Sequence, residues 1–302
     1  MTDQPEALAG VSRVDLSGTT ALVTGSTSGI GREMALALGR LGADVMVHGR
    51  DRNAGQAVVD ELTEMGRDAA FQQADFTSVA AVRELATAVG SWSDELDILI
   101  NNAGGLFRDG RLTDLGVERT FHINHLSPYL LTAELLSTLS DEARIITTAS
   151  GAHKGVTLDY GAVRSVDRYS GFRAYQRSKL ANIQFAAELS RRLDRAGQSI
   201  SSNSFHPGAI PGSGFGRFLP GPLPKLLSGL QYLPITTSVA EGASTAVYLA
   251  TAPQVADVSG RYFIDCEPAM PSRAARDSTA QRRLWKRSAV LLDIDEPLTD
   301  DD

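Results

Sequence analysis

This chain of 302 residues contains only one cysteine, Cys266. A single thiol excludes an intrachain disulfide and cannot by itself form a cysteine zinc site. We therefore predict no metal site, and we expect Cys266 to pack in a strand as a small hydrophobic side chain.

The chain also lacks long apolar runs and long basic runs. No stretch reaches the roughly 18 apolar residues of a membrane-spanning helix, and residues 1–8 have neither the basic start nor the apolar core of a secretion signal. A formal net charge of -7, from 29 basic and 36 acidic residues, argues against a nucleic-acid surface and against attraction to anionic lipid. These absences predict a cytoplasmic protein with no membrane span and no nucleic-acid partner.

What is present, 42% hydrophobic residues in a chain of this length, suffices for the core of one large α/β domain. Strand-like and helix-like segments alternate, so we predict a single Rossmann-type, doubly wound parallel sheet of about seven strands flanked by helices. This domain is expected over 16–290, between a flexible segment at 1–15 and an acidic tail at 291–302. Pro128 should kink or interrupt the helix expected over 112–139. Strands are expected near 19–25, 44–49, 69–74, 96–101, 144–149, 200–205 and 261–265, and the other helices near 29–41, 53–65, 78–91, 174–195 and 238–251.

A glycine-rich turn follows the first expected strand. It reads Thr24-Gly25-Ser26-Thr27-Ser28-Gly29-Ile30-Gly31 and leads into a helix. Such a turn lets backbone approach a pyrophosphate, while the helix N-terminus supplies free N–H groups. The glycine spacing is wider than in the G-x-G-x-x-G fingerprint. From these residues alone, an ordinary glycine turn remains the alternative to a dinucleotide site.

Tyr175 and Lys179 lie four residues apart, so a helix would place their side chains on one face. A phenol gives up its proton poorly at neutral pH, but a nearby ammonium group favours the phenolate and lowers the phenol pKa. Tyr175 is therefore a candidate general acid or base. A solvated helix face is the alternative.

Several motifs occur together in one order: the glycine-rich turn, Asn101-Asn102-Ala103-Gly104, Asn124, Ser150, and Tyr175 with Lys179. In this order and spacing, residues 16–290 resemble a short-chain dehydrogenase/reductase with the classical type of active site. The stretches 170–182, 206–208 and 259–266 resemble retinol-dehydrogenase-like and WW-domain-oxidoreductase-like members. The resemblance implies an oxidoreductase that uses a nicotinamide cofactor.

The resemblance also implies a catalytic set of Asn124, Ser150, Tyr175 and Lys179. Hydride would pass between nicotinamide and a carbonyl carbon, while Tyr175 gives or takes the proton at the oxygen. Ser150 would orient that oxygen. Lys179 would lower the tyrosine pKa and bind the nicotinamide ribose, and Asn124 would support a water in the proton relay. His153 is expected to line the pocket or pack, rather than act as a base.

Cofactor choice is predicted from the end of the second expected strand. Gly49 stands where NAD-type sites carry an acid, and the guanidinium of Arg50 suits a ribose 2′-phosphate. We therefore predict NADP (NADPH) as the preferred cofactor, with NAD as the alternative; an ordinary surface arginine is the competing interpretation of Arg50. Arg32 is either a second charge near the phosphate or a solvated side chain, and Asp75 is implied to hold the adenine amino group. The full cofactor-binding set implied by the resemblance is Gly25, Ser26, Thr27, Ser28, Gly29, Ile30, Gly31, Arg50, Asp75, Phe76, Asn102, Ala103, Gly104, Tyr175, Lys179, Pro207, Gly208 and Ile210.

The segment 215–234 is rich in Gly, Pro and Leu, and we expect it to form a substrate lid within 211–235. A membrane-dipping or partner-binding segment is the alternative. The lid favours a small apolar alcohol, aldehyde or ketone as substrate. Two other functions stay open: a catalytically idle NADP(H)-binding sensor or regulatory protein, and a related reductase acting on a C=C bond. A homo-oligomer is expected from the family alone.

Overall fold

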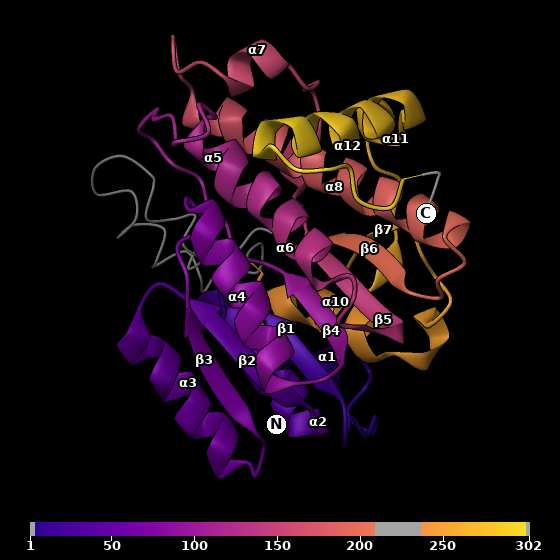
Figure 1. Cartoon of the computed structure of the whole chain (residues 1–302). Helices are drawn as coiled ribbons and strands as arrows, with labels where there is room; N and C mark the ends of the chain where they lie inside the picture. Colours follow the sequence, from indigo (N-terminus) through magenta and orange to yellow (C-terminus); the bar gives the residue numbers. More distant parts are fainter. Residues whose placement is uncertain (1–3, 209–236, 300–302) are drawn as a thin grey trace.

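The computed structural model describes residues 4–208 and 237–299, and within them eight strands form one sheet (Figure 1). The strand order is β3-β2-β1-β4-β5-β6-β7-β8, and all neighbours are parallel except β7 and β8. The predicted doubly wound parallel sheet is confirmed, with one short edge strand more than expected. The strands are β1 (Thr20–Val23), β2 (Asp44–Gly49), β3 (Ala69–Gln73), β4 (Leu96–Asn101), β5 (Leu139–Thr148), β6 (Ser201–His206), β7 (Tyr262–Ile264) and β8 (Glu267–Pro268).

Helices cover both faces of the sheet. Helices α4, α6, α8 and α12 share one hydrophobic core with the sheet, and α2, α3 and α10 share a second core on the opposite face. Figure 1 shows α4 beside α6, and α12 lying along α8. The helical elements are α1 (Pro5–Leu8), α2 (Gly29–Leu41), α3 (Arg52–Glu64), α4 (Val79–Trp92), α5 (Arg119–Phe121), the π-helical turn η1 (His122–Leu126), α6 (Ser127–Leu135), the 3-10 turn η2 (Gly151–His153), α7 (Tyr160–Val163), α8 (Gly171–Arg195), α10 (Val239–Thr251), the 3-10 turn η4 (Pro253–Val255), α11 (Arg273–Arg276) and α12 (Ser278–Leu292).

Sequence-encoded caps begin two of these helices. The hydroxyl of Ser170 accepts the N–H of Arg173 and begins α8, and Ser238 with Glu241 forms a capping box on α10. Strand β4 is a nearly continuous buried apolar run, as expected for a parallel strand covered on both faces. Because β1 lies between β2 and β4, the strand order reverses there, and open α/β sheets bind ligands outside the carboxyl ends of strands at such a point.

The prediction of a single long helix over 112–139 is wrong. Helical structure begins only after Glu118, whose carboxylate accepts the N–H groups of Thr120 and Phe121, and it then passes through η1 into α6. Pro128 lies in the first turn of α6, directly after the π-helical turn. The interruption predicted near this proline takes the form of a π-helical turn.

Both ends of the described chain pack against the fold, whereas we expected a flexible segment at 1–15 and an acidic tail at 291–302, loosely ordered from Asp293 onwards. Near the N-terminus, α1 contacts α2 and α10, and Glu6 forms an ion pair with Arg40 at 2.5 Å. Near the C-terminus, Arg192 on α8 pairs with Glu296 at 2.6 Å and donates to the carbonyl oxygen of Leu298 at 2.9 Å. Packed structure therefore continues on both sides of the expected domain.

The expectation that Cys266 packs in a strand is wrong. Asp265 and Cys266 form the two-residue connection between β7 and β8, with φ of 50° and 63°, as the tight turns of hairpins require. The N–H of Cys266 donates to the hydroxyl of Thr245 on α10 at 3.1 Å. The substrate lid expected at 211–235 lies outside the described residues. Among the helices that are described, none is long and apolar enough to cross a bilayer.

Candidate active site

The glycine-rich turn leads directly into α2, and its backbone is exposed to a potential ligand where the helix begins. Gly25 and Gly29 have φ of 68° and 60°, in the left-handed region that favours glycine. A Cβ on Gly31 would lie 2.5 Å from Nδ2 of Asn102 and closer still to the carbonyl oxygen of Gly25, whereas a Cβ on Gly29 would meet nothing within 4 Å. The side chain of Ser28 does not cap α2. Open space at Gly29 and the first N–H groups of α2 therefore form a cradle for an anion.

Hydrogen bonds join this turn to the asparagine motif at the end of β4. The hydroxyl oxygen of Thr24 accepts the N–H groups of Asn102 at 2.9 Å and Ala103 at 3.0 Å. The carboxamide of Asn102 donates back to the carbonyl oxygen of Thr24 at 2.9 Å. A Cβ on Gly25 would lie only 2.9 Å from Cα of Ala103. The structure thus brings together two of the motifs that the sequence assigned to one ligand.

His48 on β2 supports the turn, although our sequence analysis did not single it out. Its Nδ1 accepts the N–H of Gly25 at 3.2 Å, so its Nε2 is the donor to the carbonyl oxygen of Ala74 at 3.2 Å. The ring stacks on Phe76 with centroids 4.5 Å apart, and burial lowers the pKa of His48 to about 4. One neutral imidazole therefore connects the glycine-rich turn with the segment that carries Asp75, the residue predicted to bind adenine. The sequence signal was slight, a histidine inside an otherwise apolar strand.

Asp75, implied to hold the adenine amino group, is exposed beyond the end of β3. One of its carboxylate oxygens accepts hydrogen bonds from the N–H and the hydroxyl of Thr77, each at 2.9 Å. The carboxylate is thereby fixed in place at this edge of the sheet.

The residues predicted to choose the cofactor lie at the end of β2. Gly49 is buried under Thr27, since a Cβ there would lie 2.9 Å from the Thr27 hydroxyl oxygen and closer to its methyl group. An acidic side chain would not fit without a shift of the turn. Arg50 is exposed and forms no ion pair with any described residue, whereas Arg32 is paired with Glu61 at 2.5 and 2.6 Å. Of these two arginines, only Arg32 forms an ion pair with a described carboxylate, so the guanidinium of Arg50 is available to a ligand.

Ser150, Tyr175 and Lys179 meet where β5 ends and α8 begins. Tyr175, on the second turn of α8, forms a hydrogen bond with the side chain of Ser150. Lys179 is 4% exposed, and its Nζ donates to the carbonyl oxygen of Thr148 at 2.8 Å. The same Nζ lies 5.7 Å from the centre of the Tyr175 ring. The predicted stacking of tyrosine and lysine on one helix face is therefore present.

Burial dominates the electrostatics of this pair. It lowers the pKa of Lys179 from 10.5 to about 7. It also raises the pKa of Tyr175 above 10.0, against a smaller lowering by the hydrogen bond with Ser150. We had expected the lysine to lower the tyrosine pKa; the direction is the opposite, because burial disfavours both the phenolate and the full ammonium charge that would stabilise it. Tyr175 at neutral pH is a protonated phenol.

Asn124 lies in the π-helical turn η1, an irregularity that is frequent at functional sites. Its Oδ1 accepts the N–H of Gly105 at 2.9 Å, and its Nδ2 donates to the Gly105 carbonyl and to the hydroxyl of Ser178, each at 2.9 Å. The hydroxyl of Ser178 in turn donates to the carbonyl oxygen of Tyr175 at 2.8 Å. Asn124 therefore ties the 104–105 loop to the helix that carries Tyr175. Its implied role in a water relay stays a prediction.

The loop after β6 completes this edge of the sheet. Pro207 and Gly208 follow directly on His206, the last residue of β6, which is the neighbour of β5 in the sheet. Gly208 has φ of 80°, and a Cβ there would lie 2.9 Å from the methyl group of Thr237. Ile210, also predicted to bind the cofactor, lies outside the described residues.

A nicotinamide dinucleotide fits these residues on their own chemistry. The backbone cradle at α2 suits a pyrophosphate, and a Cβ on Gly104 would lie 2.7 Å from Oδ1 of Asn124 and 3.8 Å from Nζ of Lys179. Gly104 therefore lets backbone come close to Asn124 and Lys179, two of the predicted catalytic residues. Most of the predicted site residues that are described lie at or beyond the carboxyl ends of the strands or in the first turns of α2 and α8, whereas Asn124 comes from the π-helical turn η1.

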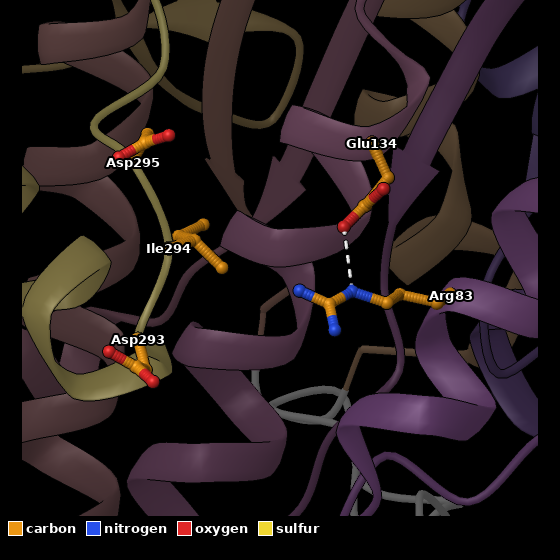
Figure 2. Close-up of a pocket in the computed structure, with 5 residues that line it drawn as sticks. All are labelled: Arg83, Glu134, Asp293, Ile294 and Asp295. Carbon is orange, nitrogen blue, oxygen red and sulfur yellow. Dashed lines mark hydrogen bonds and ion pairs between the residues drawn. The ribbon is translucent and has the colours of Figure 1, made fainter.

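A surface hollow of about 460 Å³ lies elsewhere, lined by Arg83, Glu134 and residues 293–295 (Figure 2). Figure 2 shows Arg83 and Glu134 paired across one side of it, at 2.9 Å. None of the four predicted catalytic residues lines this hollow, so it does not mark the active site. Within the described residues no group of three or more histidine, cysteine or acidic side chains is arranged to hold a metal ion.

Comparison with known proteins places this architecture in a family. The short chain dehydrogenase family model matches residues 19–213, so the chain belongs to the short-chain dehydrogenase/reductases. Mouse (Mus musculus) polyprenol dehydrogenase is 39% identical over 91% of this chain and 84% of its own length. Human (Homo sapiens) retinol dehydrogenase 14 is 35% identical over 92% of this chain and 88% of its own. Within the family the chain falls in the retinol-dehydrogenase-like branch, as the sequence motifs predicted.

A solved structure supports the cofactor class. The crystal structure of a short chain dehydrogenase from Burkholderia cenocepacia J2315 in complex with NADP superposes with a TM-score of 0.68, at 26% identity, and covers 82% of this chain and 96% of that one. Membership of this family makes the protein an oxidoreductase that uses a nicotinamide cofactor.

Proposed function

We propose that this protein is an NADP(H)-dependent oxidoreductase that transfers a hydride between nicotinamide and an apolar alcohol, aldehyde or ketone, with Tyr175 as the general acid or base. The observation that carries the proposal is the convergence of Ser150, Tyr175 and the buried Lys179 at the ends of neighbouring elements. A buried lysine is costly unless its charge or its donors are used. Within the described residues, only one of its three donors forms a hydrogen bond, to the carbonyl oxygen of Thr148.

Each side chain has a distinct task in this proposal. The bound dinucleotide supplies or accepts the hydride at its nicotinamide ring. Tyr175, protonated at neutral pH, donates its proton to the substrate oxygen in reduction and accepts it in oxidation. Ser150 donates a hydrogen bond to the same oxygen and stabilises its developing charge. Lys179 holds the ribose with its remaining donors, and a positive charge regained there would ease deprotonation of Tyr175.

The names of the two relatives support an apolar substrate. Retinol and polyprenols are long apolar alcohols, and the relatives named for them match this chain over most of its length. A catalytically idle sensor would not need to keep the serine, the tyrosine and the lysine together. The intact set therefore favours an enzyme over such a sensor. The lid at 211–235, the cytoplasmic location and a homo-oligomeric state stay predictions.

Consumption of NADPH with a panel of apolar aldehydes and ketones tests the assignment of Tyr175. Tyr175→Phe should lower turnover about 10²-fold or more and leave NADPH affinity nearly unchanged, as expected for the loss of a positioned general acid. Tyr248→Phe on α10, which removes a phenol remote from the predicted set, is the matched control and should keep full turnover. Near-normal turnover in Tyr175→Phe would defeat the proposed mechanism.

The preference for NADP rests on Gly49 and Arg50. Arg50→Ala should weaken NADPH binding by about 1–3 kcal/mol, the range for one charge-assisted hydrogen bond, and hardly change NADH binding. Arg52→Ala, an exposed arginine two residues further on, controls for a general loss of positive charge. If the wild-type protein binds NADH more tightly than NADPH, Arg50 does not select the cofactor and the proposed preference for NADP is wrong.

A further inference from the structure

We propose that His153 is a positioning residue, which holds the backbone of Ser150 and connects it to the chain segment before α11. This inference rests on the proposed function, because it concerns the placement of the Ser150 hydroxyl for that reaction. His153 is 0% exposed and lies at the end of η2, three residues after Ser150.

The two ring nitrogens of His153 have fixed and different tasks. Nδ1 lies 2.6 Å from the carbonyl oxygen of Ser150, and since a carbonyl only accepts, Nδ1 carries the hydrogen. Nε2 lies 3.1 Å from the backbone nitrogen of Ser272, which can only donate, so Nε2 is the acceptor. Both bonds require the neutral Nδ1–H tautomer. A side chain with a single polar atom could satisfy only one of them.

The short turn that follows Ser150 is held from two sides. On the side of α8, Nε2 of Gln176 donates to the carbonyl oxygens of Ala152 at 3.0 Å and Lys154 at 3.3 Å. On the other side His153 reaches Ser272, the N-cap residue of α11. Gln176 is the residue directly after Tyr175. The turn that follows Ser150 is therefore held in place by α8, next to the tyrosine, and by the C-terminal part of the chain.

Packing around the ring leaves the imidazole little freedom. Tyr262 on β7 meets it edge-on, with ring centroids 5.3 Å apart at 70°. The carbonyl oxygen of Tyr262 accepts the N–H of Ala269 at 2.8 Å, which fixes the start of the segment that leads to Ser272. The geometry of His153 is therefore set by its own turn and by two residues from the C-terminal part of the chain, Tyr262 and Ser272.

The orientation of the Ser150 hydroxyl depends on this support. The hydroxyl oxygen of Ser150 accepts the N–H of Ala152 at 3.2 Å inside the same turn, and the hydroxyl also forms a hydrogen bond with the side chain of Tyr175. The carbonyl oxygen of Ser150 also accepts the backbone N–H of His153 at 3.2 Å, so loss of the shorter ring bond leaves the following peptide held by this weaker bond alone, and the hydroxyl shifts with it. A displacement of about 1 Å at a reacting group lowers turnover by as much as about 10²-fold.

Three substitutions at His153 separate its two bonds. The amide nitrogen of asparagine lies about as far along the side chain as Nδ1, so His153→Asn keeps the donor to Ser150 and loses the acceptor for Ser272. His153→Gln reaches the position of Nε2 and keeps the acceptor. His153→Phe keeps a ring and loses both. The control is Tyr262→Phe, which alters the packing beside His153 and leaves both bonds in place.

The test measures kcat and KM for NADPH and for the carbonyl substrate in all five proteins. We expect His153→Phe to lower kcat about 10-fold or more with KM for NADPH within about 2-fold of wild type, His153→Asn to recover most of kcat, and Tyr262→Phe to match wild type. An unchanged kcat in His153→Phe, or an equal loss in His153→Asn and His153→Phe, would overturn the proposal. A wild-type protein without turnover would instead refute the proposed function.

A second measurement does not depend on turnover and uses a His153 variant only to assign signals. Imidazole ¹⁵N NMR of the wild-type protein identifies the tautomer of His153, assigned by the loss of its signals in the variant that folds best. The Nδ1–H tautomer supports the bond to Ser150, and the Nε2–H tautomer refutes it, whatever the catalytic result.

Discussion

Replacing Arg192 with methionine should cost far more stability than the same change at the adjacent Arg191. Both guanidinium groups pair with Glu188, whose side chain is 0% exposed, but the side chain of Arg192 is 5% exposed and that of Arg191 34%. Removal of one partner from a buried ion pair costs about 3–5 kcal/mol when it leaves the other charge uncompensated, and we expect the lower part of this range because Glu188 keeps Arg191 as a partner. A solvent-screened pair contributes about 1 kcal/mol or less. Arg192→Met should therefore be the worse variant by about 2 kcal/mol or more.

The assay is the free energy of unfolding from urea titrations followed by far-ultraviolet circular dichroism. In the double variant Glu188→Gln/Arg192→Met, the loss should fall short of the sum of the single losses, with a coupling of about 0.5–3 kcal/mol. Equal losses at Arg191 and Arg192, or a loss below about 1 kcal/mol at Arg192, would refute the view that burial decides the strength of this network.

Three further predictions concern the cofactor site. Gly31→Ala should weaken NADPH binding about 10-fold or more, since the added methyl group overlaps the carbonyl of Gly25, while Gly66→Ala, at a glycine with open space around it, should leave binding unchanged; fluorescence titration measures both. His48→Phe should raise the NADPH dissociation constant about 5-fold, because the ring remains but the acceptor for the N–H of Gly25 is lost; an unchanged constant would contradict this role. Lys179→Met should remove a pH dependence of stability: the folded pKa of about 7 lies below 10.5, so unfolding takes up a proton between these values and wild-type stability rises with pH across that window. Urea titrations without cofactor, at pH 7 and pH 9, should show that rise in wild type and a flatter profile in the variant.

Elements with strong local signals were predicted closely from the sequence. The helix expected at 29–41 and the strands expected at 44–49 and 96–101 agree with α2, β2 and β4 residue for residue. Helix α8 starts three residues before the expected 174 because Ser170 caps it. Caps and periodic apolar residues act over short distances, so they can be recognised without the fold.

The elements that were missed depend on distant contacts or on an overlooked pattern. Helix α12 carries buried residues at 281, 284, 285, 288, 289 and 292, a spacing that indicates an amphipathic helix and could have been found. The division of 112–139 could not be placed, because it depends on the carboxylate of Glu118, which also accepts the hydroxyl of Tyr169 at 3.1 Å. Such a contact exists only after the chain has folded.

The candidate site divides in the same way. Tyr175 and Lys179 were predicted from their spacing and Ser150 from the resemblance to the family, and the structure brings these three side chains together. His48 and His153 act on backbone groups of other residues, and no spacing rule marks them. The direction of the Tyr175 pKa was also missed, because sequence spacing reveals a charged neighbour but not the burial that outweighs it.

The attachment of the end of α8 to the C-terminal segment sets an order for biosynthesis. Arg192 stacks on Trp285, pairs with Glu296 and donates to Leu298, which is 106 residues further along the chain. A nascent chain that has released α8 from the ribosome still lacks all three partners, so Glu188 and Arg192 stay in contact with water until the last part of the chain emerges. The helix that presents Tyr175 and Lys179 therefore acquires its final support last, and an early stop codon near residue 285 would affect the catalytic helix although it removes no predicted catalytic residue.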